Sequence, residues 1–331
     1  MNEQDTLLKV EDLCVDFAAR TGAIRVLNNI DLHVRQGESL GIVGESGCGK
    51  SMTALAIMRL IPSPPGQISE SRILLRGNNI LDISEKHMQD VRGNEISMIF
   101  QEPMTSLNPV FTIGTQIAEN IQRHQGTSRS AALKQAVEMM WAVKMPIPEQ
   151  MIRQYPHELS GGMRQRVMIA MALSCQPSVL IADEPTTALD VTVQAQIFDL
   201  LLDIQKKMGT SIILITHDMA VIAEIAQRVV VMYAGHKFEE GPVREIVSNP
   251  QHPYTQGLLR CVPHLKIDPD PDREELTEIP GVVPDLSQLG KGCAFSPRCE
   301  HAMSQCYEEK PHEVEVAINH RVSCWLSNGV E

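Results

Sequence analysis

The sequence has no run of about 18 consecutive apolar residues, the length that a helix needs to cross a bilayer, so we expect no membrane-spanning segment. Its first residues, Met-Asn-Glu-Gln-Asp, are acidic and lack the apolar core of a signal peptide, so we expect no export. Basic residues are outnumbered, 29 Lys and Arg against 41 Asp and Glu, which gives a formal charge of −12. This charge argues against nucleic acid or anionic lipid as the main partner.

Length and composition are those of a soluble globular chain. The 331 residues suffice for one large domain or two smaller ones, and 43% of them are hydrophobic and 21% charged. From residue 174 on, apolar strand patterns alternate with helical ones: strands at 179–182, 211–216 and 228–233, helices at 191–208 and 219–226. Such alternation predicts an α/β fold with a mostly parallel sheet covered on both faces.

The first half of the chain adds more strands and a helical insert. We expect strands at 8–17, 24–34, 39–43 and 96–100, and helices at 52–58, 115–125, 128–143 and 161–174. Ten of the 17 methionines lie between Met88 and Met171. They either fill gaps in a helical core or form an adaptable docking surface, and both uses are compatible.

A phosphate-binding loop is predicted at Gly44-Glu-Ser-Gly-Cys-Gly-Lys-Ser51, which matches the pattern G-x-x-x-x-G-K-S/T between a strand and a helix. Glycines allow backbone N–H groups to face the β- and γ-phosphates, and the helix N-terminus adds the positive end of its dipole. Lys50 supplies a point charge and Ser51 a hydroxyl ligand for Mg²⁺. The candidate nucleotide-binding residues here are Gly44, Glu45, Ser46, Gly47, Cys48, Gly49, Lys50, Ser51 and Met52.

A second run, Leu159-Ser-Gly-Gly-Met163, resembles the signature loop of ATP-binding-cassette (ABC) ATPases. The resemblance implies a P-loop ATPase core with an α-helical signature subdomain. It also implies that Ser160, Gly161 and Gly162 bind the γ-phosphate of an ATP held by a second ATPase subunit, where small residues let the backbone approach an anion. The usual fifth residue is Gln, and here it is Met163, outside the Ser-Gly-Gly contact.

The apolar run Val179-Leu-Ile-Ala-Asp-Glu184 ends in two carboxylates and resembles the Walker B motif of the same family. Alone, this pattern is a weak signal, but it follows the other two motifs in the family's order. The resemblance implies that Asp183 holds Mg²⁺ and that Glu184 is the general base for the attacking water.

Three further positions match the family's smaller motifs. Gln101 follows a predicted strand, as the Q-loop glutamine does, and would contact Mg²⁺ and water; His217 matches the switch histidine that orients Glu184 and binds the γ-phosphate. Ala188-Leu-Asp190 resembles the D-loop, so Asp190 joins the nucleotide-site candidates. Phe17 is the aromatic candidate for stacking on adenine, with a core strand position as the alternative.

Longer runs narrow the resemblance to ATPase subunits of oligopeptide and dipeptide importers. They are Gln101–Pro109, Tyr155–Arg166, Asp183–Asp190 and Asn249–Leu259. The resemblance implies an ABC ATPase domain at 1–245, with a helical subdomain at about 102–174, and an extension at 246–331. It implies an ATPase that energises peptide import; nickel complexes, glutathione and antimicrobial peptides are alternative cargoes, and an exporter or a non-transport ABC protein are rival readings.

The same resemblance implies the protein's partners and place. Two ATPase subunits pair head to tail, each ATP lying between one phosphate loop and the other subunit's signature run. The second ATPase is a paralogue, with a homodimer as the alternative. Two transmembrane permease subunits and, indirectly, an extracytoplasmic substrate-binding protein complete the transporter, and this chain lies peripherally on the cytoplasmic face of the inner membrane.

Four of the eight cysteines gather near the C-terminus, whereas Cys14, Cys48, Cys175 and Cys261 are scattered and read as packing residues. The four are Cys293, Cys299, Cys306 and Cys324. Thiolates in a turn-rich segment can hold a 4Fe–4S cluster or zinc, and reduced thiols or disulfides remain alternatives. No C-x₂-C pair typical of zinc knuckles is present, and related importer ATPases carry a cluster at matching cysteines, so we expect the 4Fe–4S cluster, with a role in folding the tail.

Overall fold

The computed structural model describes residues 6–20, 22–101, 106–187, 189–262 and 278–327. The chain divides into two compact units. The first contains the residues up to Lys9, His33–Ser39 and Leu74–Leu214; the second contains Val10–Leu32, Leu40–Ile73 and the residues from Ile215 onward. The acidic, proline-containing segment at 268–275 lies outside the described residues.

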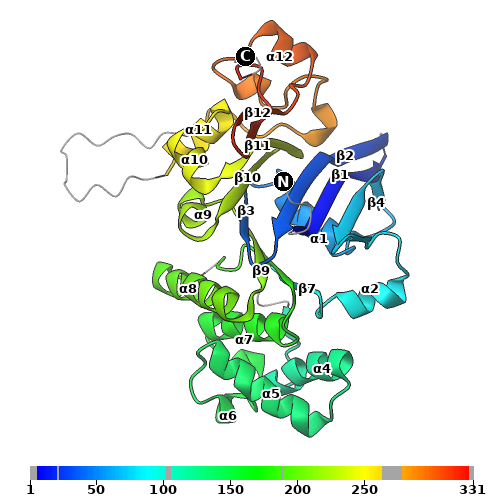
Figure 1. Ribbon diagram of the computed structural model, residues 1–331, viewed down its shortest axis with the longest axis vertical. Helices are drawn as coiled ribbons and strands as arrows, with labels where there is room; N and C mark the ends of the chain where they lie inside the picture. Colours follow the sequence, from blue (N-terminus) through cyan, green and yellow to red (C-terminus); the bar gives the residue numbers. More distant parts are fainter. Residues whose placement is uncertain (1–5, 21, 102–105, 188, 263–277, 328–331) are drawn as a thin grey trace, which may run out of the picture. The chain divides into compact units, whose positions relative to one another are not determined.

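Strands and helices alternate along most of the chain (Figure 1). The strands are β1 (Thr6–Ala19), β2 (Gly22–Arg35), β3 (Ser39–Val43), β4 (Gly66–Ser69), β5 (Arg72–Leu75), β6 (Asn78–Asn79), β7 (Ile96–Ile99), β8 (Val179–Asp183), β9 (Ser211–Thr216), β10 (Arg228–Tyr233), β11 (His236–Pro242), β12 (Val314–Ala317) and β13 (His320–Val322). The helices are α1 (Lys50–Ile57), α2 (Glu85–Val91), α4 (Ile113–Gln125), α5 (Arg129–Ala142), α6 (Pro148–Met151), α7 (Gly161–Leu173), α8 (Val191–Met208), α9 (Met219–Ile225), α10 (Val243–Ser248), α11 (Pro253–Arg260) and α12 (Ser304–Glu308).

In the first unit, buried strands carry a group of helices. Strands β9, β8 and β7 are neighbours in that order, and β7 pairs with β8 in parallel from Ile96↔Val179 to Ile99↔Ala182. Helices α4, α5, α6 and α7 lie together (Figure 1). Their ends follow from the sequence: Ser128 and Ser160 accept hydrogen bonds from the backbone three residues on and so cap α5 and α7, and Gly126 ends α4 in the left-handed conformation.

In the second unit, the parallel pattern gives way to antiparallel strands. Strand β3 pairs in parallel with β10, with Val43 opposite Val231, and the order continues through β11 and β13 to β12. The pairs β10–β11, β11–β13 and β12–β13 are antiparallel. The C-terminal segment therefore extends a sheet, although the sequence patterns predicted only turns and a cysteine cluster there.

A cluster of aromatic rings anchors the C-terminal segment in the second unit. Tyr233 at the end of β10 lies 4.7 Å from Tyr254 of α11 and 5.3 Å from Phe295, between ring centroids. Phe238 of β11 stacks on Tyr233 at 5.4 Å. Since the whole chain has only 12 aromatic residues (2 Trp, 4 Tyr and 6 Phe), four of them in one cluster mark this as the tail's main packing site.

The predicted elements are confirmed to within a few residues, from the strand at 8–17 to that at 228–233. The prediction missed the short elements β4, β5, β6, α2 and α6, and after residue 233 it gave neither the strands β11, β12 and β13 nor the helices α10, α11 and α12. Met88, Met139 and Met140 of the first unit are buried, which confirms the core-filling use, whereas Met98 and Met171 line a cavity. The use as a docking surface stays a prediction.

Candidate functional site

The candidate phosphate loop begins where β3 ends and closes into α1, all within the second unit. At Gly44, a Cβ atom would lie 2.1 Å from the carbonyl oxygen of Met232, so only glycine fits beside β10. Gly49 has φ +102°, and a Cβ there would lie 2.6 Å from Leu27 Cδ2. Glycine at these two positions therefore permits the tight turn between β3 and α1.

Lys50 holds its ammonium group inside this loop. Its Nζ donates to the carbonyl oxygens of Gly44 at 2.7 Å and Glu45 at 3.0 Å, and the residue is 5% exposed. Around it are the exposed or half-buried Ser46, Gly47, Ser51 and Met52. A buried cation surrounded by backbone at a helix N-terminus fits the phosphates of a nucleotide.

Cys48 occupies the loop with a fully buried side chain. Burial raises the pKa of its thiol, so it remains neutral and packs, as the sequence suggested. Its carbonyl oxygen accepts from the Gly235 N–H at 2.9 Å, which ties the loop to the turn after β10.

Glu45 is held by two residues that the sequence analysis missed. The Glu45 N–H donates to the hydroxyl of Tyr254 at 2.8 Å, and Arg298 donates to both oxygens of the Glu45 carboxylate, at 2.7 and 3.1 Å. Burial raises the pKa of the Tyr254 hydroxyl, so it stays protonated. Both residues come from the C-terminal region, 209 and 253 residues further along the chain.

In the first unit, Gln101 and Glu184 meet. Gln101 follows β7, and its Nε2 donates to Glu184 Oε2 at 2.9 Å. Thr187, a further residue missed from the sequence, donates its hydroxyl to the same oxygen at 3.3 Å and its N–H to the Glu184 carbonyl at 3.2 Å. Two neutral donors thus orient this carboxylate.

The backbone at Glu184 is strained, with φ +43°. A non-glycine residue in this left-handed region costs free energy of order 1–3 kcal/mol, and such strain gathers at active sites. Asp183, one residue earlier, ends β8 and is 3% exposed. The strained turn therefore begins directly after the buried Asp183 and at the more exposed Glu184.

The signature run opens α7. Ser160 caps the helix by accepting the Met163 N–H at 3.4 Å, and both Ser160 and Gly161 are exposed. Packing favours glycine at position 162, because a Cβ atom there would lie 2.9 Å from Val193 Cγ1 of α8. An exposed helix N-terminus with these small residues can accept an anion.

Asp190 caps α8, accepting the Val193 N–H at 2.9 Å. Ala188 of the same predicted D-loop lies outside the described residues. The structure thus gives Asp190 a local capping role in addition to its predicted place near the nucleotide.

His217 lies in the second unit, exposed, between β9 and α9. The backbone around it is fixed on both sides: the Asp218 N–H donates to Thr216 Oγ1 at 3.1 Å, and Asp218 accepts the Ala220 N–H at 2.8 Å to cap α9. This places the imidazole at the carboxyl end of a strand, which is where ligands bind in α/β sheets.

Phe17 is half-buried near the end of β1. It lies opposite Gly66 of β4, where a Cβ would come within 3.1 Å of the Phe17 ring. Glycine at position 66 therefore leaves room for the ring edge. Since Phe17 lies on a strand and is half-buried, adenine stacking and strand packing both stay open.

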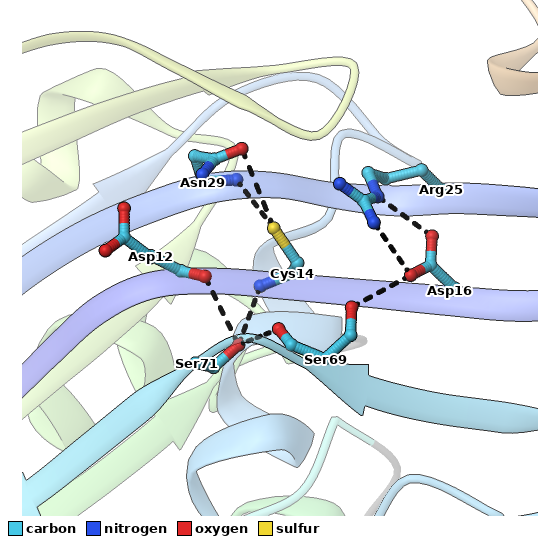
Figure 2. Close-up of polar contacts among 7 residues, drawn as sticks. All are labelled: Asp12, Cys14, Asp16, Arg25, Asn29, Ser69 and Ser71. Atoms are coloured by element: carbon cyan, nitrogen blue, oxygen red, sulfur yellow. Dashed lines mark hydrogen bonds and ion pairs between the residues drawn. The ribbon is translucent and has the colours of Figure 1, made fainter.

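Polar contacts fix the strands around Phe17 (Figure 2). Arg25 of β2 donates to both oxygens of Asp16, at 2.9 and 3.0 Å, and Ser69 of β4 donates to Asp16 Oδ2 at 3.0 Å. The Arg25 hydrogen bond lowers the pKa of Asp16. Cys14 accepts the Asn29 N–H at 3.4 Å, so this scattered cysteine has a packing role, as expected.

The candidates thus fall into two groups. The first unit brings together Gln101, Asp183 and Glu184, and also carries Ser160, Gly161, Gly162 and Asp190. The second unit carries Phe17, the phosphate loop from Gly44 to Met52, and His217. The predicted Mg²⁺ ligands Gln101 and Asp183 are in the first unit and Ser51 is in the second.

The four C-terminal cysteines lie near one another in the second unit. Burial raises the pKa of Cys293 to about 11, and the charges of the other three thiols add to this shift. The Cys293 N–H donates to the carbonyl of Cys306 at 2.7 Å, and all eight cysteines are free of disulfides. Within the described residues, no group of three or more His, Cys, Asp or Glu side chains is spaced to hold a metal ion, so the predicted metal site has no direct support.

A cavity of about 710 Å³ opens in the first unit beside β7, α4 and α7. Its lining is largely apolar and includes Met98, Ile99, Phe100, Met168 and Met171. Phe100 is 42% exposed, directly before Gln101.

Among the described residues, no helix combines the length and the apolar character needed to cross a membrane.

Two family models match the sequence. The model described as "ABC transporter" matches residues 27–187, and "Oligopeptide/dipeptide transporter, C-terminal region" matches residues 238–306. Together they cover the phosphate loop, the signature run, Glu184, and three of the four C-terminal cysteines.

Relatives match nearly the whole chain. The oligopeptide transport ATP-binding protein OppD of Bacillus subtilis is 52% identical over 97% of this chain and 88% of its own length. The dipeptide transport ATP-binding protein DppD of the same organism is 46% identical over 98% of this chain and 96% of its own length. The ATP-binding cassette MJ0796, solved as a dimer in a post-hydrolysis state bound to ADP and Pi, has a TM-score of 0.64 at 27% identity, covering 72% of this chain and 99% of that one.

Proposed function

The chain belongs to the ATP-binding subunits of ABC transporters, and on this premise we propose that it hydrolyses ATP to drive the import of peptides. The observation that carries the proposal is the identity of about half of all residues to proteins named as peptide, oligopeptide and dipeptide transport ATP-binding proteins. The identity extends through the C-terminal region, where the match is to the oligopeptide/dipeptide type. We propose an ATPase domain at 1–245, with a helical subdomain at about 102–174, and an extension at 246–331.

ATP binding follows from the phosphate loop. The N–H groups of Gly47, Gly49 and Lys50 and the ammonium of Lys50 would bind the β- and γ-phosphates, replacing the carbonyl oxygens that Lys50 now contacts. Adenine would stack on Phe17. Ser51, Asp183 and Gln101 would hold the Mg²⁺ that neutralises the phosphates.

Hydrolysis is assigned to Glu184. Its carboxylate would take a proton from water that attacks the γ-phosphate, while Gln101 and Thr187 keep it oriented by their present hydrogen bonds. His217 would bind the γ-phosphate. The strained backbone at Glu184 supports this assignment, since such a conformation is retained against its cost.

A second ATPase subunit completes each site. Ser160, Gly161 and Gly162 of one subunit would bind the γ-phosphate held by the other, and Asp190 would lie at their interface. The exposed N-terminus of α7 supports this role, and the similar cassette MJ0796 is described as a dimer. We propose a paralogue as the partner, with pairing of two copies of this chain as the alternative.

Permease subunits would dock on the cavity of the first unit. A helix of the membrane partner with apolar side chains fits the lining of Met98, Phe100, Met168 and Met171. Because Gln101 follows Phe100 directly, docking there can be transmitted to Glu184. The protein would then lie peripherally on the cytoplasmic face of the inner membrane, served by a separate extracytoplasmic substrate-binding protein.

For the four cysteines we propose a 4Fe–4S cluster that cross-links the tail. Three of the thiols face backbone N–H groups, of Phe295 for Cys293, His301 for Cys299 and Leu326 for Cys324, and the Met303 N–H donates to Cys306 Sγ at 3.5 Å. N–H groups aimed at sulfur stabilise thiolate ligands. Cys293, Cys299, Cys306 and Cys324 would hold the cluster, which would supply a cross-link between these parts of the tail. Anaerobic purification with iron and sulfide analysis tests this, and a colourless, iron-free protein refutes it.

Transport assays test the main proposal. The chain is co-expressed with its membrane partners, reconstituted in vesicles and supplied with the binding protein and labelled di- or oligopeptides. We expect ATP-dependent uptake that is lost when Glu184 is replaced by Gln in every copy. Uptake of nickel complexes, glutathione or antimicrobial peptides in place of ordinary peptides would overturn the peptide assignment, while leaving the ATPase assignment intact.

A further inference from the structure

The phosphate loop carries a negative charge that needs explanation. Glu45 directly follows Gly44 at the end of β3, in a loop whose ligand is a polyanion. An unpaired carboxylate at this position would repel the phosphates of a nucleotide. How its charge is balanced therefore matters for binding.

Arg298 balances this charge from the C-terminal region. Its guanidinium forms a two-pronged ion pair with Glu45, and the Arg298 side chain is 5% exposed against 28% for Glu45. Pairs of this geometry at a largely desolvated site are stronger than surface ion pairs. Arg298 also lies over the rings of Tyr233 and Phe295, at 5.7 and 5.9 Å from their centroids.

All five N–H groups of Arg298 have acceptors. Nε donates to the Pro280 carbonyl at 2.7 Å and Nη2 to the Ile279 carbonyl at 3.1 Å, in addition to Glu45. Nη1 donates to the Tyr233 hydroxyl at 3.3 Å and to Glu45. A guanidinium has five donors, so none is left to bind a phosphate directly. Arg298 is therefore placed to act through Glu45.

The main chain of Glu45 is fixed as well. Its N–H donates to the Tyr254 hydroxyl, and its carbonyl accepts from Lys50 Nζ at 3.0 Å and from the Cys48 N–H at 3.3 Å. The peptide that orients the Lys50 ammonium is thus held by a residue of α11. Both ends of Glu45, backbone and carboxylate, depend on the C-terminal region.

We propose that Arg298 and Tyr254 are positioning residues for the phosphate loop, through which the C-terminal region controls nucleotide affinity. Arg298 neutralises Glu45 and keeps its carboxylate turned to the guanidinium, and Tyr254 fixes the Glu45 backbone. The region matched to oligopeptide and dipeptide transporters therefore belongs functionally to the nucleotide site of this chain.

A charge-rescue cycle tests the proposal. The equilibrium dissociation constant of Mg-ATP is measured on the full-length protein and on Arg298→Met, Glu45→Gln and the double variant. We expect Arg298→Met to weaken ATP binding on the order of tenfold, with a smaller loss for ADP, because the freed carboxylate repels the phosphates. The double variant should bind ATP as Glu45→Gln does, whatever the affinity of Glu45→Gln itself, since no charge remains at position 45 to repel the phosphates.

Controls separate this from a loss of fold. Arg321→Met removes an exposed arginine of the same region, 3.8 Å from Glu313, and should leave ATP binding unchanged. Arg298→Lys keeps the charge without the fork and should lose no more than about threefold. If Arg298→Met does not fold, Arg298→Gln replaces it in the same cycle, and thermal unfolding verifies each variant.

The outcomes are distinct. ATP binding that is unaffected by loss of Arg298, or that is weakened equally whether residue 45 is Glu or Gln, would overturn the proposal. Failure of the wild-type protein to bind ATP at all would instead overturn the nucleotide assignment of the loop.

Discussion

Two glutamates at the ends of buried strands are held in opposite ways. Glu45, after β3, is paired with the guanidinium of Arg298, whereas Glu184, at the end of β8, receives hydrogen bonds from the neutral Gln101 amide and Thr187 hydroxyl. A guanidinium cancels the charge of a carboxylate; neutral donors orient the carboxylate and leave its charge in place. The first arrangement suits a structural element beside an anion, and the second suits a base.

The backbone differs in the same sense. Glu184 adopts a strained left-handed conformation, while the strain at the phosphate loop is taken by glycines, including Gly49. Where a residue with a reactive side chain keeps a strained backbone, the direction of that side chain matters more than the free-energy cost of the strain. The comparison assigns chemistry to Glu184 and support to Glu45, and each assignment can be broken by experiment.

The largest effect is expected for Glu184→Gln. The amide cannot accept the proton of the attacking water, so hydrolysis in the assembled transporter should fall by about 10²–10⁴-fold while ATP binding persists. Phosphate release and ATP binding are measured together. Asp203→Asn, which removes an exposed carboxylate paired with Lys144, is the matched control. Near-normal hydrolysis by the Glu184→Gln variant would contradict the role of Glu184 as general base. The Lys50→Ala variant should lose ATP binding itself.

Sequence alone located the motifs on the Glu184 side of this comparison, and the catalytic role of Glu184 stays a prediction. The order of phosphate loop, signature run and Asp183-Glu184 indicated the family, because each motif needs particular residue types at fixed spacing. The comparisons with known proteins confirm the family and the fold class. The buried strands that place these motifs are long apolar runs, which are the most readable signals in a sequence.

The contacts that hold Glu45 could not be predicted from motifs. Arg298 and Glu45 are 253 residues apart, and nothing in local periodicity brings them together. The ion pair between Arg298 and Glu45 depends on the antiparallel strands β11, β13 and β12 and on the cluster of Tyr233, Tyr254 and Phe295. The sequences of these three strands are short and turn-rich, and they gave no strand signal. Thr187 was missed for a similar reason, since its hydroxyl gains meaning only from the turn at Glu184.

Acid should weaken the contacts that hold the Glu45 backbone, because a buried histidine lies at the start of α11. Burial lowers the pKa of His252 to about 4, and the nearby charge of Glu239 opposes this only in part. The unfolded chain, with an ordinary pKa of 6.5, therefore binds the proton first as pH falls, and stability present above pH 6.5 is lost towards pH 4. At pH 5 we expect a loss of roughly 2 kcal/mol from this group.

This loss of stability should affect the contacts of Glu45, because His252 lies at the start of α11. His252 Nδ1 accepts the Tyr254 N–H at 3.0 Å, and a proton on Nδ1 would abolish that contact. Denaturant unfolding and ATP binding are measured from pH 7.5 to pH 5. His252→Gln should flatten the dependence of both, and His301→Gln, an exposed position, should not. An unchanged slope in His252→Gln would contradict this origin.

A smaller effect is expected at the neutral support of Glu184. Gln101→Ala removes the amide at 2.9 Å, and kcat should fall about tenfold, because the carboxylate is less well oriented. Gln101→Glu should be worse, since two carboxylates would then face each other. Steady-state kinetics on the assembled transporter measure both variants. Equal activity of Gln101→Glu and the wild type would show that neutrality of the donor is unimportant.

The smallest effect, and the finest test of the comparison, is Tyr254→Phe. It removes one acceptor and leaves the partly buried Glu45 N–H without its hydrogen bond, which should cost about 1 kcal/mol of unfolding free energy and weaken ATP binding about two- to threefold. Tyr307→Phe, whose hydroxyl contacts the Ser296 carbonyl away from the loop, is the control. Because Tyr254 carries no charge, its loss should be the same with Glu or Gln at position 45. If ATP binding weakens only when residue 45 is Glu, Tyr254 would instead take part with Arg298 in balancing the Glu45 charge. The backbone and the carboxylate of Glu45 would then be held by the same set of contacts.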